Sequence, residues 1–161
     1  MFRALRACIG LLAFCLALAA QAADFDTTKR AAEAGDAQAQ FSLGVMYHNG
    51  EGVPQNDAEA MKWSRKAADQ GNAPAQNNLG VMYANGQGVP GNNVIAYALW
   101  NLAAAQESAS GNHDASNNRS KLVNGMTAQA IEAGQALSRQ MGQPGNLFKA
   151  LDSYRPGPNQ R

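Results

Sequence analysis

Cysteine and histidine are the scarcest reactive residues in this 161-residue chain. The two cysteines, Cys8 and Cys15, lie near the N-terminus, and the two histidines are His48 and His113. The chain after residue 22 therefore offers no disulfide, no thiol nucleophile and no thiolate metal ligand. No group of His, Asp and Glu shows metal-ligand spacing, and no nucleophile-elbow, phosphate-loop or dinucleotide-binding motif occurs. The sequence thus indicates a non-enzymatic protein with no catalytic residue, no metal and no cofactor.

Long apolar runs are also missing, apart from one short run near the start. Arg3 and Arg6 precede an apolar core at residues 9–18, and the small-residue motif Ala-Gln-Ala ends at Ala22. This pattern is typical of a cleaved signal peptide over residues 1–22, and the apolar run is short for a membrane anchor. A lipid-anchored variant is disfavoured because Phe14 precedes Cys15. We expect a periplasmic or secreted protein with no membrane span after cleavage.

Charge of one sign is not in excess. The full chain has 13 Lys and Arg against 12 Asp and Glu, and losing Arg3 and Arg6 leaves a net charge of −1. A near-neutral chain of about 139 residues has no general affinity for nucleic acid or anionic lipid, and its length suits one domain.

What the sequence does contain is a repeat. Residues 35–70 and 71–106 align without a gap and share 19 of 36 positions, including the phrases LGVMYHNGEGVP and LGVMYANGQGVP. Each unit predicts two helices joined by a glycine-rich turn, the first ending at Asn49 or Asn85 and the second at Gln70 or about Glu107. One such unit cannot bury its apolar face alone, so neighbouring units must stack.

The flanking segments predict further helices. Residues 23–34 form an N-terminal capping segment, with a helix that starts at Asp26 and ends before Gly35. Residues 107–141 form a closing helix pair, over 113–124 and 127–141, with Thr127 as the N-cap of the second helix. Residues 142–161 form a flexible tail, in which Leu147, Phe148, Leu151 and Tyr154 have the spacing of a short docking helix.

Small and apolar residues recur in register and predict the packing. Mid-helix glycines cost about 1 kcal/mol against alanine, so finding one at the same place in both units suggests close helix contact. We assign structural roles to the first-unit residues Leu43, Gly44, Tyr47, Gly50, Gly52, Ala60, Trp63, Ala67, Ala68 and Gly71, and to the second-unit residues Leu79, Gly80, Tyr83, Gly86, Gly88, Ala96, Ala103 and Ala104.

These residues resemble the Sel-1-like repeat, a branch of the tetratricopeptide-like superfamily. The second unit departs from the pattern at Leu99, which stands where an aromatic residue is expected, with Trp100 next to it. The resemblance implies an all-α fold, an α/α solenoid of antiparallel helix pairs. It implies an adaptor that binds a partner protein or peptide. An inhibitor or immunity-type binder of a toxic effector enzyme is an alternative, and a cell-wall-acting enzyme is a third. Cysteine-rich members are credited with acting on β-lactams, and this chain lacks their cysteine pairs.

The resemblance also implies where the partner binds. In tetratricopeptide-like folds the first helix of each pair lines the concave surface. The candidate partner-binding residues are Gln38, Phe41, Val45, His48 and Asn49 in unit one, Pro74, Asn77, Val81, Ala84 and Asn85 in unit two, and Asp114, Asn117, Lys121 and Asn124 in the closing segment. Asparagine amides pair with an extended peptide backbone, and Phe41, Val45 and Val81 supply an apolar floor. The lysine clamp that grips a carboxylate terminus is absent from both units.

Overall fold

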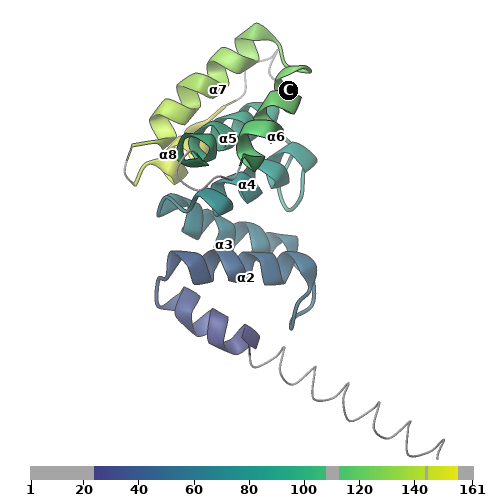
Figure 1. Cartoon of the computed structure of the whole chain (residues 1–161), viewed down its shortest axis with the longest axis vertical. Coiled ribbons are helices and arrows are strands. Elements are labelled where there is room, and N and C mark those ends of the chain that lie inside the picture. The colour runs from purple at the N-terminus through teal and green to yellow at the C-terminus, as the bar shows by residue number, and fades with distance from the viewer. Residues whose placement is uncertain (1–23, 108–112, 144, 156–161) are drawn as a thin grey trace, which may run out of the picture.

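The computed structural model describes residues 24–107, 113–143 and 145–155, and every regular element within them is a helix (Figure 1). A first helix is described over residues 24–33. It is followed by α2 (Ala37–Asn49), α3 (Asp57–Asp69), α4 (Ala73–Asn85), α5 (Asn93–Glu107), α6 (Asp114–Val123), α7 (Ala128–Met141) and α8 (Leu147–Ser153). From the first helix to α5 the helices succeed one another along the long axis of the molecule, and the predicted all-α solenoid is confirmed. The expected signal peptide lies outside the described residues.

The two units begin and end their first helices with the same local chemistry. The side chains of Asp36 and Asn72 cap α2 and α4 by accepting hydrogen bonds from the third amide of each helix, at 2.6 and 2.9 Å. Gly50 and Gly86 end these helices in the left-handed conformation, with φ values of 73° and 69°, which glycine adopts without steric cost. Identical turn chemistry therefore sets the length of both helices.

Of two other predicted helix starts, one is confirmed and one is wrong. Thr127 caps α7 through its side-chain oxygen, as expected, and Asn56 caps α3 in the same way. The predicted start of the first helix at Asp26 is wrong, because residues 24 and 25 are already helical. Asp26 instead uses its carbonyl oxygen inside the helix to accept a hydrogen bond from Arg30.

Close packing inside each unit depends on a glycine in its first helix. A Cβ atom at Gly44 would lie 2.7 Å from Ser64 Oγ and 3.2 Å from the Ala60 carbonyl oxygen, and one at Gly80 would collide with the indole of Trp100. Ser64 and Trp100 occupy the same repeat position, so the second unit carries its aromatic residue one place later than the first. Trp100 is held there by a hydrogen bond from Nε1 to the Asn77 carbonyl oxygen, 3.1 Å away.

The residues assigned structural roles divide into two groups. The apolar ones are buried, apart from Tyr47 and Ala104, which are half-buried, and the mid-helix glycines are buried with them. The turn glycines are exposed and have positive φ; these are Gly50, Gly52, Gly71, Gly86 and Gly88.

Helix α5 is the centre of the second half of the molecule. It packs against α4, α6 and α7, and seven consecutive residues from Val94 to Trp100 are buried. A helix covered on several sides is apolar all round, which explains why its first fourteen residues carry no charge. Asn101 joins two of these neighbours, because its amide donates to Ser138 Oγ on α7 at 3.0 Å and its oxygen accepts from Arg119 on α6 at 2.6 Å.

Helices α6 and α7 do not pack as the repeated pairs do. Each lies against α5, and the two make little contact with one another. Gly134 of α7 brings its backbone close to Tyr97 of α5, where a Cβ atom would lie 2.6 Å from the ring. Helices α6 and α7 therefore follow one another in the chain but do not form a packed helix pair.

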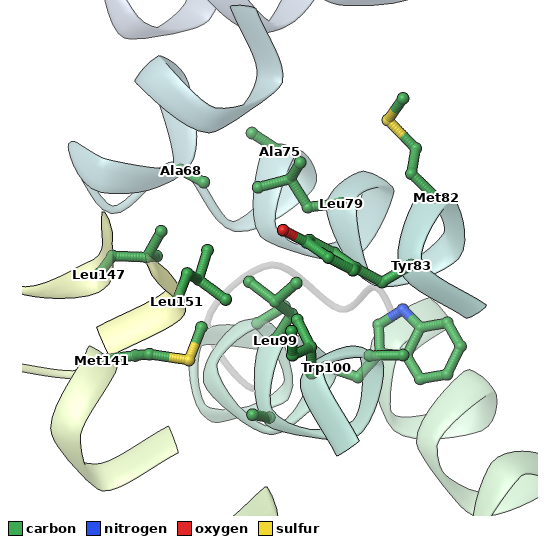
Figure 2. Close-up of a cluster of buried hydrophobic side chains, with 14 of the residues drawn as sticks. Ala68, Ala75, Leu79, Met82, Tyr83, Leu99, Trp100, Met141, Leu147 and Leu151 are labelled. Atoms are coloured by element: carbon green, nitrogen blue, oxygen red, sulfur yellow. The ribbon is translucent and has the colours of Figure 1, made fainter. Parts of the chain in front are cut away.

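Helix α8 docks on α7 and returns to α3 of the first unit (Figure 1). Its Leu147 and Leu151 point into the same cluster as Leu79, Tyr83 and Leu99 (Figure 2). On its outer side, the Arg65 guanidinium of α3 lies 2.7 Å from the Asp152 carboxylate and 4.7 Å from the Phe148 ring. The segment whose spacing predicted a docking helix therefore does dock, and its Asp152 pairs with a residue 87 positions earlier in the chain.

Candidate interaction site

A hollow of about 650 Å³ opens where helices α2, α4, α5 and α6 meet. Helix α5 contributes residues near its C-terminus, α6 contributes its first two residues, and α2 and α4 contribute the rest. The lining residues are Phe41, Val45, Ala73, Pro74, Asn77, Asn78, Val81, Ala103, Gln106, Glu107, Asp114 and Ala115. Six of the residues expected on the concave surface are among them: Phe41, Val45, Pro74, Asn77, Val81 and Asp114.

The hollow has an apolar floor with amides beside it. Phe41, Val45 and Val81 are half-buried, so part of each side chain faces solvent. Val45 and Val81 occupy the same position of the two repeats, as do Phe41 and Asn77. Asn77 is held in place, since its Oδ1 accepts a hydrogen bond from Asn118 of α6 at 3.2 Å. The floor is therefore continuous across two stacked units, and its polar edge is anchored.

The helices that supply this floor carry almost no charge. Neither α2 nor α4 contains a Lys, Arg, Asp or Glu, and His48 is the only histidine in either. Helix α3, which is no longer than they are, contains six Lys, Arg, Asp and Glu residues. Because a helix face that only meets water is usually charged or polar, an uncharged, partly apolar face indicates contact with something else.

Four of the predicted partner-binding residues are engaged within the chain, away from the hollow. His48 Nδ1 lies 2.9 Å from the Asp57 carboxylate, which joins the end of α2 to the start of α3. The Gln38 side chain accepts a hydrogen bond from Asn72 at 3.3 Å. The amides of Asn49 and Asn85 donate to the neighbouring turn residues, Glu51 at 2.8 Å and Gln87 at 3.3 Å. His48 thus has a partner that sequence inspection did not recognise.

The remaining predicted residues also lie off the lining. Ala84 is half-buried against the core. Asn117 and Lys121 are exposed on α6, and Asn124 is exposed just after it. The neighbour of Asn117, Asn118, is the α6 residue that reaches α4, where it donates to Asn77.

Glu107 is the lining residue that sequence inspection missed most clearly. It is 7% exposed, and its carboxylate accepts hydrogen bonds from the Ala115 amide at 2.5 Å and from the Ser116 hydroxyl at 2.5 Å. It therefore caps α6 in place of His113, which makes no side-chain cap. Burial alone would raise the pKa of Glu107, but the hydrogen bonds from Ser116 and Ala115 outweigh it and hold the pKa below its ordinary value. The carboxylate is thus a fixed negative charge in the wall of the hollow.

Other missed lining residues had a sequence signal. Ala73, Asn78, Ala103 and Gln106 come from the repeated region, where their helical spacing follows from the alignment. For Glu107 and Ala115 no signal exists, because their positions depend on how α6 docks on α5.

Among the residues that the structure describes, no group of three or more His, Cys, Asp and Glu could hold a metal ion. Within the same residues, no helix is long and apolar enough to cross a membrane.

Stacked helix pairs with a hollow across their first helices define an α solenoid. The family model of the Sel1 repeat matches residues 37–72 and 73–108. The chain therefore contains two consecutive Sel1 repeats. Sel1 repeats are generally protein–protein interaction modules and typically non-catalytic scaffolds. A comparison with curated proteins finds no match.

Two solved structures are similar to this fold. One is a protective antigen of uropathogenic Escherichia coli strains that displays an SLR fold; it has 29% sequence identity and a TM-score of 0.71 over 83% of this chain. The other is a Sel1 repeat protein from Oxalobacter formigenes, with 40% identity and a TM-score of 0.50 over 51% of this chain. This chain covers 28% of the length of the first and 63% of the second.

Proposed function

We propose that this protein is a non-enzymatic adaptor that binds a segment of a partner protein in the hollow between α2, α4, α5 and α6. The observation that carries the proposal is the uncharged pair α2 and α4, which presents Phe41, Val45 and Val81 half-buried at an open surface. Association through such a surface gains about 25 cal/mol for each Å² of apolar area removed from water. A volume near 650 Å³ is within the range of ligand-binding clefts and suits a few residues of a peptide.

An inhibitor of a toxic enzyme would use the same surface and is the second candidate. The identity of the partner separates the two, because an inhibitor binds one enzyme and abolishes its activity. A cell-wall-acting enzyme is the third, and no constellation of nucleophile, base and charge stabiliser among the described residues supports it.

The test uses protein expressed from the full sequence as bait for envelope extract, with captured proteins identified by mass spectrometry. The double variant Val45→Asp and Val81→Asp places charge on the floor, and Ala31→Asp with Ala105→Asp places the same charge at exposed sites elsewhere. Circular dichroism confirms that both variants fold. A partner captured by the parent and the control but not by the floor variant supports the proposal. A partner captured equally by all three rules out the hollow as its binding site.

We further propose that the protein works outside the cytoplasm, in the periplasm or after secretion. This proposal is supported by the signal-like pattern over residues 1–22. Expression of the full sequence in a Gram-negative host, followed by fractionation and intact-mass measurement, tests it. A periplasmic product that begins at Ala23 is expected, and a cytoplasmic product of full mass would contradict it.

A further inference from the structure

The charged residues of the hollow are all of one sign. Among the described residues that line it, Glu107 and Asp114 are the only charged side chains, and none is a Lys or Arg. The Lys and Arg residues of α6 lie outside this lining: Arg119 donates to Asn101 of α5, and Lys121 is exposed in the last turn of α6. His113, just before α6, is close enough to act electrostatically on Glu107. The electrostatic character of the hollow is therefore set by two carboxylates at the junction of α5 and α6.

The start of α6 offsets only part of this negative charge. A helix N-terminus is equivalent to about half a positive charge, and both carboxylates lie beside it. The Glu107 carboxylate is bound by the amides of Ala115 and Ser116 and by the Ser116 hydroxyl, so it is fixed in position. Asp114 is the first residue of α6 and is exposed. Half a positive charge cannot cancel two carboxylates, so this wall stays negative beside a floor with no charged side chain.

The apolar floor and the acidic wall together indicate which kind of partner segment the hollow favours. A segment that lays an apolar side chain on Phe41, Val45 and Val81 brings its next residues to the wall formed by Glu107 and Asp114. A cationic side chain there gains Coulomb energy, whereas an acidic one meets like charge near a low-dielectric surface. Long Lys and Arg side chains also rest their apolar stems on such a floor while the charged end reaches the wall.

We propose that the hollow selects partner segments in which an apolar side chain stands next to a lysine or arginine. The inference rests on the proposed function, since it assigns a chemistry to the occupant of the same hollow. It predicts discrimination between partner segments by charge: basic-apolar segments bind, and acidic-apolar segments of the same length and hydrophobicity do not.

We call this preference for a basic residue beside an apolar one the charge rule. A random twelve-residue peptide library displayed on phage tests it without knowledge of the natural partner. Three forms of the full protein serve as bait: the parent, the floor variant Val45→Asp with Val81→Asp, and the charge-reversal variant Asp114→Lys. Asp114 is chosen over Glu107 because the Glu107 carboxylate caps α6, so its removal would alter the fold of the wall. Circular dichroism and thermal unfolding verify that each bait is folded.

The proposal expects peptides enriched on the parent to pair apolar residues with Lys or Arg and to be lost on the floor variant. On Asp114→Lys the basic preference should disappear. A synthetic peptide of the enriched consensus should bind Asp114→Lys about tenfold more weakly than the parent, and the difference should shrink at high salt. Asp114→Asn should weaken the same peptide about threefold.

The other outcomes separate the two proposals. Peptides that depend on Val45 and Val81 but show no basic preference, or keep it on Asp114→Lys, overturn the charge rule and leave the hollow as the binding site. A library from which no peptide depends on the floor overturns the hollow itself, and the charge rule with it.

Discussion

The side-chain amide of Gln76 donates a hydrogen bond to the carbonyl oxygen of Ala68, 3.3 Å away, and so ties the first turns of α4 to the end of α3. Gln40 makes the same bond to Ala32 in the first helix at 3.1 Å. In each unit the glutamine oxygen accepts from a second glutamine, Gln106 at 3.2 Å and Gln70 at 2.8 Å. The glutamines are thus a repeated device that joins each unit to the helix before it.

Gln76→Ala should lower the free energy of unfolding by about 2 kcal/mol. Gln76 is 4% exposed, and its loss leaves the Ala68 carbonyl and the Gln106 amide without their partner, which costs more than an exposed hydrogen bond does. Urea unfolding monitored by circular dichroism measures the change. Gln87→Ala, which removes a turn bond to Asn85, is the control and should change the value by less than about 0.5 kcal/mol. Equal effects of the two variants would contradict a role in stacking.

Gly80→Ala should destabilise the protein although alanine favours a helix. The propensity gain is about 1 kcal/mol, but the added methyl group requires Trp100 to move and threatens its bond to Asn77, at a cost of about 2–3 kcal/mol. Gly44→Ala faces Ser64, whose hydroxyl can rotate, so its net effect should be smaller. Thermal unfolding compares the two. Adding Trp100→Leu to Gly80→Ala makes room for the new methyl group, so the double variant should lose less stability than the two single variants added together. Additive losses of stability would argue against the contact between Gly80 and Trp100.

Leu151→Ala should cost about 2–4 kcal/mol, whereas Asp152→Asn should cost less than about 1 kcal/mol. Leu151 is 6% exposed in the core, and the Asp152 side chain is 68% exposed, so its pairing with Arg65 is largely screened. Because no residue of α8 lines the hollow, binding of a hollow-dependent peptide should survive in both folded variants. Loss of that binding in folded Leu151→Ala would show that α8 acts on the hollow.

Glu107 should contribute a stability that acid removes. Its pKa in the folded protein lies below the ordinary value of 4.5, so the folded state favours the carboxylate more than the unfolded state does. This contribution is present above the unfolded pKa and is lost as the pH falls through the folded pKa. Glu107→Gln should therefore be less stable than the parent at pH 7, and the difference should narrow toward pH 3. Glu132→Gln, at an exposed position of α7, is the control. A difference that does not depend on pH would contradict the role of the charge.

The repeated part of the fold was predictable because its signals are local. Caps such as Asn56, left-handed glycines such as Gly50 and the close approach at Gly44 follow from residue type and a 36-residue period. The docking of α6 and α7 on α5 was not predictable, because these two helices lie outside the repeated units. The floor of the hollow, Val45 and Val81, came from the repeat positions, whereas the acidic wall at Glu107 arises from tertiary contact and has no counterpart in the first unit.

The return of α8 to α3 changes how this protein should assemble. In repeat arrays each unit ordinarily contacts only its neighbours, so folding spreads along the chain and the ends can melt separately. Here the Arg65–Asp152 pair and the buried Leu151 connect the first repeat to a segment synthesised long after it. The first repeat completes its packing on a growing chain only when α8 has emerged. The molecule should then unfold as a single cooperative unit, with one transition by every probe, rather than one repeat at a time.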